Sequence, residues 1–345
     1  MKKKRIFWAV IFILLTVSAV VVITQQSETF SVGSFLGYCR SARPLWLVTA
    51  FVCMLGFIFF EGLAIRVIAR GLGYSCPLPN AMAYSASDIF LSAITPSATG
   101  GQPACAYCMV RDGLPLAMTS VTLLLNLVMY TLSIVLLSVC SLVFFPSAFS
   151  AFGGVSRGLI LAGVIIQMAL TGGLLLLIFR GQTAIRLAGK GLHLLHRMHL
   201  IKNVEQRQEK LARLAQDYQA CAASIRTHRR MLLPAFLCNL VQRTCTILVT
   251  VCVFLAVGGN WRQSLDVFAT QSLVITGSNC IPIPGAVGVS DYLFLDSFGR
   301  CFHDPASIDL LTRGISFYIC VCISAIVTWL WLLADKKKKK KERTQ

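Results

Sequence analysis

Residues 85–112 read SASDIFLSAITPSATGGQPACAYCMVRD, a sequence that begins like a membrane helix and then breaks. The apolar run ends at Thr95-Pro96, and paired glycines follow at Gly100 and Gly101. Proline removes a backbone donor and glycine loosens the backbone, so helical hydrogen bonding should fail at residues 94–103. Backbone freed at membrane depth is tolerated only where it is buried in protein or lines a cavity. The stretch therefore predicts a re-entrant or half-helix segment, with a loop between two ordinary spans as the alternative.

A second break of the same kind occurs much later in the chain. Residues 273–291 read LVITGSNCIPIPGAVGVSD, and the apolar run fails over residues 277–291. Two prolines and two glycines again interrupt a stretch that begins like a span. The recurrence favours a re-entrant or half-helix segment at both places over a simple loop.

The composition excludes an ordinary soluble domain, because 56% of the 345 residues are hydrophobic and only 13% are charged. Several apolar runs exceed the ~18 residues that a helix needs to cross a bilayer. We expect an all-α polytopic membrane protein, a single integral membrane domain over residues 1–345 with about six full spans and the two broken segments. The expected spans are Phe7–Thr24, Leu45–Val67, Ala117–Phe145, Leu159–Phe179, Met231–Val257 and Ile315–Leu333.

The net charge of +18 arises from basic residues between the spans, chiefly in residues 180–230 and in the tail 336–345. Short basic segments of this kind face the cytoplasm, so we expect this loop and both termini to be cytoplasmic. Their placement argues against nucleic-acid binding as a main role. Three histidines in the loop, His193, His196 and His199, are spaced by three residues, so on a helix they do not all face one ligand. This spacing favours a solvated face over a metal site.

The fourteen cysteines do not indicate a metal or redox centre. Most of them lie within apolar runs, where free cysteine behaves as a small hydrophobic residue. Cys105 and Cys108 form one CxxC pair without a second pair beside it, which is a weak signal. We therefore expect no metal and no cofactor.

The expected orientation gives the two breaks opposite directions. The first, in the half formed by residues 1–180, enters and leaves from the cytoplasmic side. The second, in the half formed by residues 231–335, enters and leaves from the external side. Two oppositely oriented broken segments predict inverted repeats that meet at a binding site near the midplane of the membrane.

Charged residues inside the membrane are costly and usually form pairs or serve function. The candidates are Glu61, Asp88, Arg243 and Asp291, and Arg243 is the strongest because it lies centrally in an apolar span. Its planar guanidinium suits a phosphate or a carboxylate. A structural ion pair of Arg243 with Glu61 or with Asp291 is the alternative.

Glycines of the breaks would let backbone amides approach a lipid phosphate, with helix N-termini adding a positive end. No catalytic pattern, phosphate-binding loop or dinucleotide fingerprint is present in the sequence. The headgroup site is therefore expected to include, beside the four charged residues, Pro96, Gly100, Gly101, Gln102, Arg111, Pro282, Pro284, Gly285 and Gly288.

Both breaks resemble motifs of the lysylphosphatidylglycerol synthase transmembrane-region family, which contains flippase-like membrane proteins. The resemblance rests on ITPSATGGQP at residues 94–103, on Arg111-Asp112-Gly113 and on PIPGAVGVSD at residues 282–291. It covers nearly the whole chain, and the form of the first motif resembles versions in Gram-positive bacteria. Many relatives have Glu at the positions of Gln102 and Asp291, so an acid role does not carry over to Gln102.

The resemblance implies lipid handling in a bacterial cell membrane. In full-length relatives, a soluble domain transfers lysine from lysyl-tRNA to phosphatidylglycerol, and the membrane half moves the product outward, where it repels cationic antimicrobial peptides. The printed sequence ends at Gln345 without a segment that resembles this domain. The leading hypothesis is a phospholipid flippase. The alternatives are a lipid-modifying transferase, the membrane partner of a separate synthase or transferase subunit, and a scaffold that holds anionic lipid.

Overall fold

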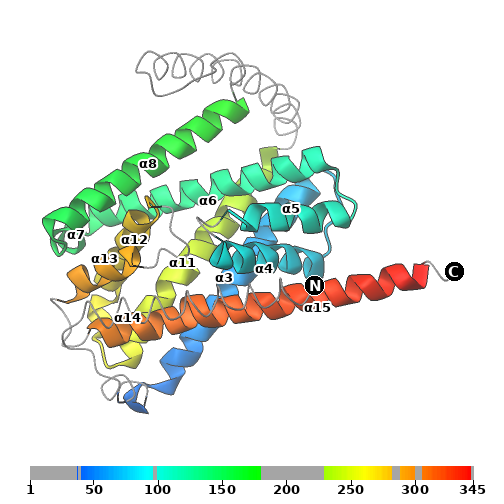
Figure 1. Ribbon diagram of the computed structural model, residues 1–345. Helices are drawn as coiled ribbons and strands as arrows, with labels where there is room; N and C mark the ends of the chain where they lie inside the picture. Colours follow the sequence, from blue (N-terminus) through cyan, green and yellow to red (C-terminus); the bar gives the residue numbers. More distant parts are fainter. Residues whose placement is uncertain are drawn as a thin grey trace.

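The computed structural model describes residue 37 and residues 40–95, 99–179, 229–281, 288–299 and 305–342. All regular structure in these ranges is helical (Figure 1). Five of the helices described are long and apolar enough to cross a membrane, which confirms the class predicted from composition. They are Pro44–Gly71, Leu116–Phe144, Gly154–Leu176, Arg229–Ala256 and Pro305–Ala334. The expected first span, Phe7–Thr24, and most of the basic loop lie outside the described residues.

Two antiparallel helices, α3 (Pro44–Gly71) and α11 (Leu232–Ala256), pack along their whole lengths and form the centre of the bundle. Proline at the first turn starts α3 without losing a helical hydrogen bond, and uninterrupted apolar residues continue it. At one end the N–H of Arg43 donates to the carbonyl of Ala256 at 2.9 Å, and at the other Gly71 lies against Met231. We refer to these as the Ala256 end and the Gly71 end of the bundle.

The first break is a re-entrant hairpin of α4 (Leu78–Ile94) and α5 (Gly101–Arg111). Thr95 ends α4 by adopting an extended conformation, with φ −108° and ψ 144°. At the base, Asp112 follows α5 and accepts hydrogen bonds from two residues of α4, Tyr84 at 2.5 Å and Asn80 at 2.8 Å. Both limbs therefore begin and end at the Gly71 end of the bundle, which decides between the alternatives left open by the sequence.

The second break is a hairpin of α12 (Ser264–Ser278) and α13 (Val289–Phe298) that enters from the Ala256 end. Its limbs are tied to the short helix α7 (Pro146–Ser150) and the turn after it. Ser147 donates to Asp266 of α12 at 3.4 Å, and the N–H of Gly153 donates to Asp296 of α13 at 2.7 Å. The two hairpins are thus oppositely oriented, as the sequence predicts.

Three further rods complete the bundle. They are α6 (Leu116–Phe144), α8 (Gly154–Phe179) and a continuous last rod made of α14 (Pro305–Arg313), the π-helical η5 (Gly314–Ile319) and α15 (Cys320–Glu342). Short 3-10 turns, η2 (Arg229–Met231) and η3 (Trp261–Gln263), precede α11 and α12. The order span, hairpin, span thus occurs twice in opposite directions, as α3, α4–α5 and α6 and as α11, α12–α13 and the last rod, with α8 as a further span after the first set (Figure 1).

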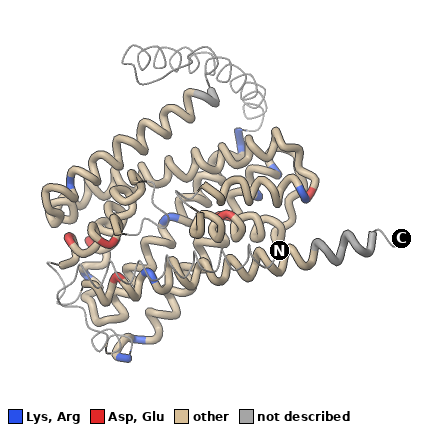
Figure 2. Tube along the Cα trace, in the orientation of Figure 1, with Lys and Arg blue, Asp and Glu red and all other residues tan. Residues whose placement is uncertain are grey.

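Apolar side chains cover the outside of this arrangement as well as its core. Leu116, Ile165, Met168 and Trp329 are more than half exposed on the outer rods, as expected for helices that face lipid. Charged residues are few along most of the described trace (Figure 2). The buried charges in the interior of the bundle therefore need an explanation, which the cavity between the hairpins supplies.

Candidate binding cavity between the two hairpins

A cavity of about 610 Å³ inside the bundle is lined by residues of both hairpins. The first hairpin contributes Ser92 and Gln102 beside its break, and the second contributes Ser278, Asn279 and Ser290. Helices α3, α6 and α11 and the last rod, from α14 through η5 to the start of α15, form the rest of the wall. Residues that flank both breaks thus line a chamber within protein, the setting that makes irregular backbone tolerable at membrane depth.

Arg243 lies in this wall, in the middle of α11. Its guanidinium stacks on the ring of Tyr130 at 4.3 Å and lies 5.1 Å from the ring of Phe57. One terminal nitrogen donates to the hydroxyl of Tyr130 at 3.4 Å, and the buried Nε has no hydrogen-bond partner. Arg243 takes part in neither of the ion pairs found among the described residues. The rings of Tyr130 and Phe57 hold the guanidinium of Arg243 in place while leaving N–H donors for a ligand.

Glu61 of α3 and Asp88 of α4 face each other beside Arg243, and each is 8% exposed. Their carboxyl groups interact with each other, and Glu61 also interacts with the side chain of Gln242. Ser92 donates to Asp88 at 3.3 Å. The sequence identified both acids, but their contact joins residues from two different helices and was not predictable from spacing.

The paired glycines at the tip of the first hairpin have a packing role. A Cβ on Gly101 would collide with the carboxylate of Asp88 and the hydroxyl of Ser92. The N–H of Gly100 donates to the side chain of Thr95 at 2.9 Å. The missing side chain of Gly101 therefore lets the N-terminus of α5 approach Asp88 closely, where the positive end of the helix favours a carboxylate.

A second charged cluster belongs to the other hairpin. Arg313 of α14 pairs with Asp291 of α13 and with Asp309, the latter at 3.8 Å. Asp291 is fully buried, and its other oxygen accepts the N–H of Gly288 at 2.8 Å. Gly288 has φ +87°, a conformation that glycine adopts readily. The partner of Asp291 is thus Arg313 rather than Arg243, and its carboxylate holds the start of α13.

Arg313 and Asp309 line the cavity and were not among the residues selected from the sequence. The available signal was their i,i+4 spacing just before the last apolar run. Among the other expected residues, Gln102 lines the cavity, whereas Arg111 lies at the base of the first hairpin, with its guanidinium 5.7 Å from the ring of Trp331. Outside the described residues are Pro96, Pro282, Pro284 and Gly285.

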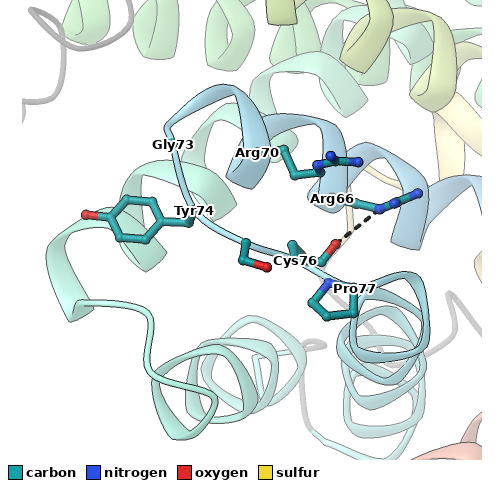
Figure 3. Close-up of a pocket in the computed structure, with 7 residues that line it drawn as sticks. Arg66, Arg70, Gly73, Tyr74, Cys76 and Pro77 are labelled. Carbon is teal, nitrogen blue, oxygen red and sulfur yellow. Dashed lines mark hydrogen bonds between the residues drawn. The ribbon is translucent and has the colours of Figure 1, made fainter.

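A separate hollow of about 410 Å³ opens at the Gly71 end, in the link between α3 and α4 (Figure 3). Arg66 and Arg70 lie along it, and Arg66 donates to the carbonyl of Cys76 at 3.1 Å. Burial raises the pKa of the Cys76 thiol from 9.0 to about 11. This thiol is therefore protonated at neutral pH and is a poor nucleophile.

The fold and the cavity define a polytopic helical membrane protein in which two opposed re-entrant hairpins enclose a charged chamber. The chain belongs to the family described as the lysylphosphatidylglycerol synthase TM region, whose model matches residues 7–324. This confirms the resemblance carried by the two Pro/Gly motifs, and it places the chain among membrane proteins of lysylphosphatidylglycerol-related lipid handling. No curated protein matches the chain.

Proposed function

We propose that this protein moves phospholipid headgroups across a bacterial cell membrane, with both termini in the cytoplasm. The observation that carries this proposal is the position of Arg243, which lines a cavity shared by both hairpins and whose Nε has no hydrogen-bond partner. A phosphodiester supplies the acceptors that this guanidinium lacks. Hairpins that enter from opposite ends are suited to opening such a site to one side at a time.

The favoured substrate is lysylphosphatidylglycerol or a related aminoacylated phospholipid. Its headgroup carries a phosphate and ammonium groups. The cavity carries groups of opposite charge, the guanidinium of Arg243 for the phosphate and the carboxyl groups of Glu61 and Asp88 for an ammonium. Outward movement would enrich the outer leaflet in cationic lipid, which repels cationic peptides. The family match supports this class of lipid but not the direction of movement.

Leaflet exchange in vesicles tests the proposal. The full chain is reconstituted, and fluorescent phosphatidylglycerol and its lysyl ester are followed by quenching from one side of the membrane. We expect the wild type to exchange the lysyl ester and Arg243→Ala to lose at least tenfold in rate, an effect of about 1.4 kcal/mol on the barrier. The exposed Arg262 offers the matched control Arg262→Ala, which should exchange at the wild-type rate.

The second candidate function is the membrane part of a lysyltransferase, because the family is described by a synthase. This role requires a partner that supplies lysyl-tRNA chemistry, or transfer by the chain itself. Incubating the purified chain with lysyl-tRNA and phosphatidylglycerol decides the matter. Formation of lysyl ester together with no leaflet exchange would replace the transport proposal with this one.

A further inference from the structure

Glu61 and Asp88 place two interacting carboxyl groups side by side in the wall of the cavity. Two carboxylates this close cannot both be ionised in a medium of low dielectric, because like charges repel strongly there. One proton between them removes the repulsion and supplies the donor of a hydrogen bond. The resting pair then carries a single negative charge, which the nearby guanidinium of Arg243 balances.

Unsatisfied amide oxygens indicate that this region receives a donor. Gln242, 1% exposed and in contact with Glu61, has an Oε1 without a hydrogen-bond partner. Gln271, 9% exposed, lines the cavity with its own Oε1 unpartnered. Buried acceptors without donors are costly unless a ligand satisfies them. A primary ammonium in the cavity, with three N–H donors and a positive charge, matches the cavity-lining oxygens of Gln271, Glu61 and Asp88.

We propose that Glu61 and Asp88 form a proton-exchange site, in which one shared proton leaves when the ammonium of a lipid headgroup binds. This rests on the proposed function and adds its energy source. The proton departs to water on the open side, and the ammonium takes its place between two ionised carboxylates. One positive charge replaces another, so the buried charge beside Arg243 stays balanced throughout. Movement of protons into the cell down their electrochemical gradient then drives the outward movement of the headgroup.

Other titratable or charged groups face the pair from the surrounding helices and set its charge balance. Arg243 of α11 is the cation that acts on Glu61, Cys105 of α5 lies near both acids, and Cys320 of α15 lies near Glu61. The cavity wall adds Tyr130 of α6 and, across the chamber, Asp309 and Arg313 of α14. Asp309 and Arg313 are paired with each other, so Glu61 and Asp88 are the cavity-lining acids of the described residues that lack a cation within ion-pair distance.

The test uses the full chain in vesicles that contain fluorescent lysylphosphatidylglycerol, with the membrane voltage clamped at zero. A gradient of one pH unit should enrich the lipid about tenfold in the leaflet that faces the acidic side, since a one-for-one exchange converts a tenfold proton ratio into a tenfold lipid ratio. Glu61→Gln and Asp88→Asn should leave the leaflets equally filled. Asp266→Asn, an exposed carboxylate on the second hairpin, is the matched control and should keep the enrichment.

A second measurement does not depend on the variants folding. Adding the lysyl ester to the wild-type chain in weakly buffered detergent solution should release one proton for each lipid bound, with loss of the infrared band of a protonated carboxyl group. Binding without proton release would overturn the proton exchange, as would rapid leaflet exchange that ignores the gradient; both results leave the transport proposal standing. Failure of the wild type to bind or exchange lipid at all would overturn the transport proposal, and the proton exchange with it.

Discussion

Tyr84 and Asp112 lie 28 residues apart, and their side chains meet in a hydrogen bond of 2.5 Å. The bond closes the base of the first hairpin, because Tyr84 belongs to α4 and Asp112 follows α5. Asn80 adds a second donor to the same carboxylate oxygen at 2.8 Å. The return of the chain to the end where it entered thus depends on contacts outside both Pro/Gly motifs.

Replacing Tyr84 by Phe should loosen this base. The ring is 1% exposed, so packing is preserved while the carboxylate loses one donor. We expect the free energy of unfolding to fall by about 1–2 kcal/mol, the usual cost of leaving a partner of this kind unmatched. Thermal unfolding in detergent measures it. Tyr107→Phe is the control, because its ring is 59% exposed, and an equal loss in both variants would contradict the assignment.

Replacing Gly101 by Ala should push the two limbs of the first hairpin apart. The added Cβ meets Asp88 and Ser92, and inserting a methyl group into a filled space costs about 1–3 kcal/mol. Gly172→Ala in α8 is the matched control, because no atom lies within 4 Å of its added Cβ. In that position alanine favours the helix by about 0.5–1 kcal/mol. Opposite shifts in melting temperature are therefore expected, and two equal shifts would refute the close approach at Gly101.

The buried pair of Arg313 and Asp291 should show strong coupling in a double-mutant cycle. Removing one partner of a buried ion pair leaves an uncompensated charge, at a cost of about 3–5 kcal/mol. Asp291→Asn and Arg313→Gln should each destabilise the protein, and the double variant should be less destabilised than the sum of the two. Denaturant unfolding of the wild type, the two single variants and the double variant gives the free energies of unfolding that the cycle compares. Additive effects would mean that the two residues act independently.

The Cys76 thiol should show a shifted pH profile. The thiolate is the reactive form, and burial raises the pKa of this group to about 11. The protein is alkylated with iodoacetamide at several pH values, and mass spectrometry follows the peptide that contains Cys76. The rate of Cys76 alkylation should still rise between pH 9 and pH 10. A cysteine at the exposed position 75, made as Ser75→Cys, should level off near its ordinary pKa. A plateau for Cys76 at that lower pH would show that the thiol is not buried.

The spans and the two breaks were predictable because their signals are local. An apolar run long enough to cross a bilayer and a proline that interrupts it are both legible without tertiary structure, as at Thr95-Pro96. The opposite orientations of the two breaks followed from the number of spans between the basic segments that were expected to face the cytoplasm. Whether the first break returned as a hairpin was not legible, because the answer lies in the contact of Tyr84 with Asp112.

The cavity was predictable only in part. Arg243, Glu61 and Asp88 attract notice as charges within apolar sequence, and all three line the chamber. Arg313 precedes the apolar run of the last span and therefore reads as a residue at the membrane boundary. Its burial results from the pairing with Asp291, a contact between elements that spacing along the chain does not encode.

The opposed hairpins also determine where an electric field would act. Each reaches inward from one end and turns back, so a polar chamber occupies depth that a full span would fill with apolar side chains. Charged groups that line the chamber, such as Arg243, therefore lie at a depth where a transmembrane voltage acts. A charge that crosses the whole of that voltage changes its energy by about 2.3 kcal/mol for each elementary charge at 100 mV.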